Sequence, residues 1–161
     1  MLKSESVWNP HYMHLINDME KVQKRATKIL RQCRCLNYRQ HLEVLNLPTL
    51  AFRRNRGDMI GVYKNLTGKY DPTLPSILHR DIISTTRGNS LILCTYRLKY
   101  DLCEYNFTVR VISLWNSLPT PVITAVSVDS FKNRLEKFWA NEEARFDYKA
   151  NLFGSGFARC F

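Results

Sequence analysis

The spacing of apolar residues between Pro10 and Arg34 constrains this chain most strongly. Asn9 can cap a helix that starts there, and Pro10 suits its first position because proline lacks a donor that would go unpaired anyway. The spacing therefore predicts a long helix with one apolar stripe. The stripe repeats every three or four positions, as one face of an α-helix does: Leu15, Met19, Val22, Ala26, Ile29 and Cys33.

Basic residues follow the same period on the opposite side of this helix: Lys21, Lys24, Arg25, Lys28 and Arg31. The charge on this side is almost uniform, whereas a neutral helix face mixes acids with bases. The whole chain has 24 Lys+Arg against 14 Asp+Glu, a formal net charge of +10, and a field of that sign attracts polyanions. Two interpretations remain open: a face that follows a phosphate backbone without reading bases, or an ordinary solvated helix exterior.

Periodic spacing also predicts helices over 37–45, 49–67 and 107–118, and a last helix from Ser127 to about residue 139. Residues 70–90, with prolines and a glycine, predict a loop, and residues 91–100 predict one or two short strands. The expected fold is a small, mainly α domain with these strands near 91–100. The residues expected inside it are Leu42, Leu45, Phe52, Met59, Tyr63, Leu66, Val111, Trp115, Val128, Phe131, Leu135 and either Phe138 or Trp139.

Three arginines, Arg53, Arg54 and Arg56, lie near the start of the predicted helix over 49–67. The helix macrodipole disfavours cations at that end. The conflict indicates a charged partner for these side chains, although three solvated arginines can also sit there at small cost.

No catalytic constellation is present in the sequence. A two-metal polymerase site needs paired aspartates, and the chain has no adjacent Asp-Asp, because Asp71 and Asp101 each lack an acidic neighbour. It also lacks a phosphate-binding P-loop and a nucleophile elbow. We therefore expect no enzymatic activity of the chain alone, no cofactor and no small-molecule substrate.

The cysteines and the N-terminal residues bear on compartment and metal binding. Five cysteines cannot form a complete disulfide set, and Cys33, Cys35 and His41 lack the spacing of a zinc knuckle, so we expect free thiols and no metal. Residues 1–10 contain no apolar run of a secretion signal, and no stretch is long enough to cross a bilayer. These features predict an intracellular protein, nuclear or cytoplasmic and not secreted, without a membrane partner.

Short motifs follow one another in a fixed order from Trp8 to Trp139: WNP (8–10), MEKVQKRATKI (19–29), LPTL (47–50), RRNRGDMI (53–60), RGNS (87–90), WNSLP (115–119) and SVDSFKNRL (127–135). In this order and spacing they resemble the C-terminal region of non-long-terminal-repeat (LINE-type, jockey-like clade) retrotransposon reverse transcriptases. The departures are small: Met19 stands where that family often has Leu, and Asn89 where it often has His. Some related elements end in a zinc knuckle, which is not found here.

The resemblance implies that residues 8–139 form a helical region that follows the polymerase domain and contacts RNA or DNA. It makes the polymerase domain a partner, since the family's Asp-Asp motif lies upstream of this region, and it adds Arg87 to the candidate nucleic-acid contacts. Residues 1–7 are then a divergent N-terminal stub, and residues 140–161 are expected to be a frayed tail. The alternative is a protein-docking module, or a relic without function, with a merely solvated basic face. A docking module should expose an apolar patch, at Trp8 or on the first-helix stripe.

Overall fold

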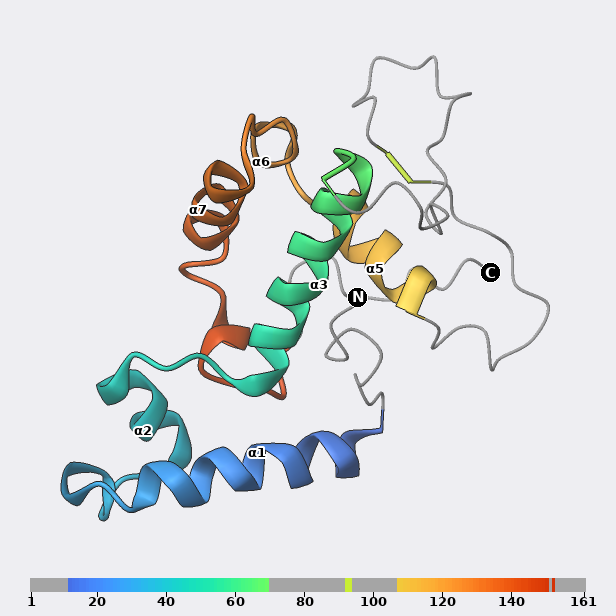
Figure 1. Cartoon of the computed structure of the whole chain (residues 1–161). Helices are drawn as coiled ribbons and strands as arrows, with labels where there is room; N and C mark the ends of the chain where they lie inside the picture. The colour runs from blue at the N-terminus through green and yellow to red at the C-terminus, as the bar shows by residue number, and fades with distance from the viewer. Residues whose placement is uncertain (1–11, 70–91, 94–106, 151, 153–161) are drawn as a thin grey trace.

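The computed structural model describes residues 12–69, 92–93, 107–150 and 152. Within these ranges the protein is mainly helical, which confirms the predicted fold class (Figure 1). The helices are α1 (Met13–Lys28), η1 (Arg31–Cys33), α2 (Tyr38–Leu45), α3 (Leu50–Leu66), α5 (Phe107–Asn116), α6 (Thr120–Ile123), α7 (Val128–Phe138) and η2 (Glu143–Arg145).

Helix α3 is the central element of this arrangement. It contacts α5 and α7, α6 contacts α7, and the α1–α2 pair packs against the N-terminal end of α3 (Figure 1). The hydrophobic core lies where α3, α5 and α7 meet. The Tyr63 ring stacks on the Phe131 ring with centroids 4.4 Å apart, and the centroid of the Trp115 ring lies 5.9 Å from that of Phe131. The Tyr63 hydroxyl donates to the Ala125 carbonyl at 2.6 Å, so this aromatic cluster is also tied to the chain before α7.

Most residues that the periodicity placed inside are buried: Leu42, Phe52, Met59, Tyr63, Leu66, Val111, Trp115, Phe131 and Leu135. At the end of α7 the buried side chain is Trp139, whereas Phe138 is 37% exposed. The ring of Trp139 meets Phe52 of α3 edge-on at 5.7 Å. Leu45 and Val128 are only partly buried.

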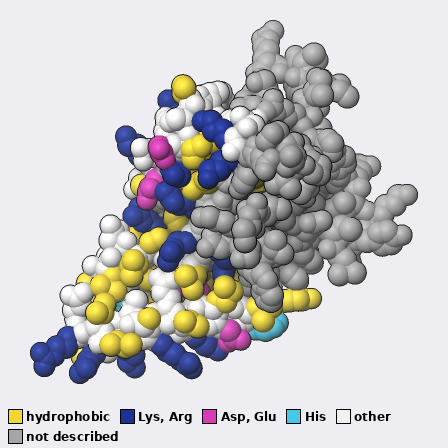
Figure 2. Space-filling view, in the orientation of Figure 1, with side chains coloured by type: hydrophobic (Ala, Val, Ile, Leu, Met, Phe, Trp, Pro, Cys, Tyr) yellow, Lys and Arg dark blue, Asp and Glu magenta, His cyan; other side chains and the backbone are white. Residues whose placement is uncertain are grey.

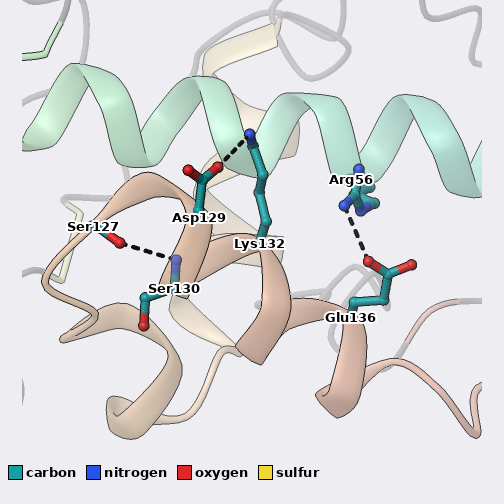
Figure 3. Close-up of polar contacts among 6 residues, drawn as sticks. All are labelled: Arg56, Ser127, Asp129, Ser130, Lys132 and Glu136. Carbon is teal, nitrogen blue, oxygen red and sulfur yellow. Dashed lines mark hydrogen bonds and ion pairs between the residues drawn. The ribbon is translucent and has the colours of Figure 1, made fainter.

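The expected helix ends are set by capping side chains. Thr49 accepts a hydrogen bond from the Phe52 amide at 3.2 Å, and Ser127 accepts one from the Ser130 amide at 3.1 Å (Figure 3). Such caps satisfy amides that have no partner inside the helix. After α3, Gly68 takes a φ of +66°, a left-handed conformation that glycine adopts without a Cβ penalty.

Two predictions about the elements are wrong, and one short helix was not predicted. The first helix runs from Met13 to Lys28 rather than to residue 34, because Leu30 takes an extended conformation with φ −69° and ψ 130°. The sequence did not predict the short helix α6, at whose start Pro119 and Pro121 lie, since proline fits a first helical turn. Residues 140–150 are not a frayed tail: η2 packs at the α2–α3 junction, where the Thr49 hydroxyl donates to the Ala144 carbonyl at 3.1 Å.

The predicted strands near 91–100 overlap the described residues only at Ile92 and Leu93. There the backbone of Leu93 pairs with a side chain: its amide donates to Asn116 Oδ1 at 3.1 Å, and its carbonyl accepts from Asn116 Nδ2 at 3.0 Å. The remaining residues of the predicted strands, and the predicted loop over 70–90, lie outside the described residues.

Helix α1 packs with a polar face and not with its apolar stripe. Glu20 is 2% exposed and Thr27 is 5% exposed, whereas Leu15, Met19, Val22 and Ile29 all lie open to solvent. One Glu20 oxygen accepts from the Tyr38 hydroxyl at 2.6 Å, and the other accepts from the Ala51 amide in the first turn of α3 at 3.0 Å. A single buried carboxylate therefore joins α1, α2 and α3.

We predict that Glu20→Ala lowers the free energy of unfolding by about 2–3 kcal/mol, because two donors lose their buried acceptor. Glu43→Ala is the matched control, since Glu43 makes an exposed ion pair with Arg39 at 3.0 Å and should change stability little. Chemical unfolding followed by circular dichroism measures both. Equal effects of the two substitutions would contradict the proposed role of Glu20.

Candidate nucleic-acid interface

The basic side of α1 is exposed along its length. Lys21, Lys24, Arg25 and Lys28 are all exposed, and Figure 2 shows basic side chains along the lower edge of the molecule, where α1 runs in Figure 1. Residues three, four and seven apart share a helix face, so these cations lie side by side. The sequence prediction that they form one face is confirmed for these four residues.

Few acids neutralise this face. Lys21 pairs with Asp18 at 2.8 Å, and that hydrogen bond lowers the pKa of the Asp18 carboxyl below its ordinary value. No carboxylate in the described ranges forms an ion pair with Lys24, Arg25 or Lys28. These three cations remain available for a phosphate backbone.

The other candidate arginines lie elsewhere. Arg31 is exposed but belongs to η1, beyond the break at Leu30, so it does not continue the face of α1. Arg53 is exposed on α3. Arg54 donates to the Met19 sulfur at 2.9 Å, and Arg56 pairs with Glu136 of α7 at 3.2 Å (Figure 3). Arg54 and Arg56 therefore contact neighbouring helices, and Arg87 lies outside the described residues.

The apolar stripe of α1 is also exposed. Val22 is 66% exposed and Ile29 is 77% exposed, and Leu15 and Met19 lie on the same side. Figure 2 shows apolar side chains facing the viewer above the basic lower edge. Helix α1 thus has three sectors: a polar sector buried against α2 and α3, a basic sector and an apolar sector. This is the exposure expected for the first-helix stripe of a docking module.

A cleft of about 440 Å³ opens between α1, α2 and residues 146–149. Three aromatic residues and four cationic residues line it: Tyr38, Phe146 and Tyr148, with Lys21, Lys24, Arg39 and Lys149. Lys21 and Lys24 belong to both the cleft and the basic face of α1. Sequence analysis missed the contribution of residues 146–149, because it placed them in a frayed tail. The alternation of aromatic and charged residues in Phe146-Asp147-Tyr148-Lys149 was the available signal.

The described residues include two free thiols, and they form neither a metal-binding group nor a helix able to cross a membrane. Among the described residues no group of three or more His, Cys, Asp or Glu is placed to hold a metal ion. Cys33 is buried and Cys35 is exposed, and both are free thiols. His41 is buried between Thr27, 3.1 Å from its Nδ1, and the Leu36 carbonyl, which accepts from its Nε2 at 2.9 Å. None of the described helices combines the length and the apolar character needed to cross a membrane.

Comparison with models of protein families, with curated proteins and with solved structures gave no significant match for this chain.

We predict that Tyr38, which lines this cleft, makes the stability of the protein depend on pH. Burial, and then the neighbouring Glu20 carboxylate, raise the pKa of Tyr38 above its ordinary value near 10. The stability from this shift is therefore fully present below about pH 10 and falls as the pH rises above it. Tyr38→Phe should cost about 1–2 kcal/mol at neutral pH, because the hydrogen bond to Glu20 is removed.

Because phenylalanine does not ionise, the stability gap between the two proteins should narrow above about pH 10. Urea unfolding at neutral and alkaline pH measures the gap. A gap that stays constant across this range would show that folding does not raise the pKa of Tyr38.

Proposed function

We propose that this chain is a non-catalytic, nucleic-acid-binding region, equivalent to the C-terminal part of a LINE-type reverse transcriptase, an RNA-directed DNA polymerase. One observation carries the binding proposal: Lys24, Arg25 and Lys28 form an exposed face without described acidic partners. The motif order from Trp8 to Trp139 supports the proposed family.

The length of the basic face suits a phosphate backbone. A helix rises about 1.5 Å per residue, so Lys21 and Lys28 lie roughly 10 Å apart along the axis, near three phosphate steps of one DNA strand. Contacts of this kind hold the backbone of RNA or DNA and carry no base sequence. The proposed partner is therefore nucleic acid in general, bound with low sequence specificity.

We predict that Lys24→Glu combined with Lys28→Glu weakens binding to all oligonucleotide sequences about equally and flattens the dependence of affinity on salt. The logarithmic salt slope should fall by roughly one for each lysine that no longer binds a phosphate. Fluorescence anisotropy with single- and double-stranded oligonucleotides at two salt concentrations measures both effects.

The matched control is Lys69→Glu combined with Lys137→Glu. Both lysines are exposed and lie outside α1, Lys69 after the end of α3 and Lys137 in α7, so the change in net charge is the same. The control should bind nearly as well as the unmodified protein. An equal decrease in affinity for both double variants would assign the binding to net charge and remove the α1 face from the proposal.

A second candidate function is supported by the apolar stripe of α1. We propose, as the alternative, that this stripe docks on another protein, with the upstream polymerase domain of the parent element as the occupant. Large apolar patches on soluble proteins usually mark interaction sites. Arg25 lies three residues after Val22 and four before Ile29, so it borders the stripe. A partner with an apolar surface and an acidic edge would complement it.

We predict that Val22→Ser combined with Ile29→Ser abolishes capture of a co-expressed LINE-type polymerase domain and raises the solubility of the isolated chain. Because both side chains are exposed, the melting temperature should change little. Val126→Ser is the control, since Val126 is 89% exposed but lies outside α1. Capture that survives the double substitution would argue against this docking surface, and absence of capture by the unmodified chain would exclude this partner.

A further inference from the structure

We propose that the cleft between α1, α2 and residues 146–149 binds one unpaired nucleotide, with its base stacked on Tyr148 and its phosphate between Lys24 and Lys149. This inference rests on the proposed function, and it adds that the preferred ligand is single-stranded. The volume of about 440 Å³ lies within the range of roughly 300–1,000 Å³ that is typical of ligand clefts.

The cleft continues the basic face of α1. Lys21 and Lys24 line its α1 side, so a strand that follows α1 passes its opening. Of its cations, Lys21 pairs with Asp18 and Arg39 pairs with Glu43. Lys24 and Lys149, in contrast, form no ion pair with a described carboxylate. These two ammonium groups are therefore the ones that can bind a phosphate entering the cleft.

The two acids of the cleft are already engaged. Glu20 accepts from Tyr38 and from the Ala51 amide, and Asp147 accepts from the Lys149 amide at 2.9 Å. Their oxygens are thus partly satisfied within the protein, and the cations exceed the acids along the wall. The field in the cleft favours an anion over a cation.

The aromatic rings provide a stacking surface. Tyr148 is only partly buried, and its ring lies 6.3 Å from that of Tyr38 at an interplanar angle of 57°. At this tilt the two tyrosines do not cover one another's faces as parallel stacked rings would. Bases stack on such faces with little dependence on sequence, because every base has a π-face. An aromatic wall beside free cations is the combination that single-strand-binding proteins use.

The geometry selects unpaired bases. In a duplex the bases are stacked and paired inside the helix, so none can reach a side-chain ring in a cleft without being extruded. A single strand exposes its bases at no such cost. The duplex should therefore use only the outer face of α1, while the single strand uses both the face and the cleft.

The test compares a fluorescent oligothymidylate with a duplex of similar length, binding to the full chain and to Tyr148→Ala. Removing one base–aromatic stack should weaken single-strand binding by about 5-fold to 100-fold. Duplex binding should be nearly unchanged. Tyr148→Phe keeps the ring and should keep the affinity, which separates stacking from any effect of the hydroxyl. Lys137→Ala, an exposed lysine of α7, is the control outside the cleft.

Lys149→Glu provides an independent variant in case Tyr148→Ala does not fold, because Lys149 is exposed and its ammonium makes no described ion pair. It should reduce single-strand affinity more than duplex affinity. Photo-cross-linking of a bromodeoxyuridine-substituted single strand should label the peptide that contains Tyr148.

The outcomes separate the two proposals. If Tyr148→Ala and Lys149→Glu leave single-strand binding unchanged while Lys24→Glu with Lys28→Glu reduces it, the cleft inference is overturned and the basic face stands. Equal decreases in affinity for single strand and duplex would also overturn it, because stacking affects only unpaired bases. If the unmodified chain binds neither ligand, the proposed function fails, and this inference fails with it.

Discussion

The buried carboxylate of Glu20 is the contact on which the arrangement of the N-terminal half depends. It accepts from Tyr38 of α2 and from the Ala51 amide of α3, so one side chain fixes two helices against α1. Burying an unpaired carboxylate costs several kcal/mol, and these donors offset that cost. Gln23 and Thr27 extend the polar contact, since Gln23 Nε2 donates to the Pro48 carbonyl at 3.2 Å and Thr27 Oγ1 lies 3.1 Å from His41 Nδ1. Helix α1 is thus held by polar groups, which leaves its apolar and basic sectors open.

The same contact resolves the charge conflict at the start of α3. Arg53, Arg54 and Arg56 place cations near a helix N-terminus, where the macrodipole favours anions. Glu20 supplies the missing negative charge from α1, because its carboxylate accepts directly from the amide of Ala51 in the first turn. Arg56 is drawn away toward Glu136 of α7. Acidic residues of the protein itself therefore partly compensate the cations at the start of α3, and an external charged partner is less needed there. The nucleic-acid proposal depends on α1 rather than on these arginines.

Local signals in the sequence were sufficient for α2, α3, α5, α7 and the central core. Thr49 and Ser127 are capping residues by type and position, and the spacing of Phe52, Met59 and Tyr63 identifies the buried face of α3. The orientation of α1 was not predictable in this way. The side of α1 with regular apolar spacing is exposed. Its buried side centres on Glu20, whose hydrogen-bond partners Tyr38 and Ala51 lie 18 and 31 positions further along the chain. The cleft was not predicted for the same reason: Tyr148, which lines it, lies far along the sequence from the α1 and α2 residues that line its other side.

The two exposed sectors of α1 bear on whether nucleic-acid binding and protein docking would exclude one another. On a helix, residues one apart point about 100° away from each other, so the stripe through Val22 and Ile29 and the face through Lys21, Lys24 and Lys28 look in different directions. A protein docked on the stripe would leave these lysines and the cleft open, although Arg25 borders both surfaces. Docking on the stripe and nucleic-acid binding on the basic face would therefore use different sides of this helix. A partner that covered the stripe would also remove apolar surface from water while leaving the basic side as the face presented to a strand.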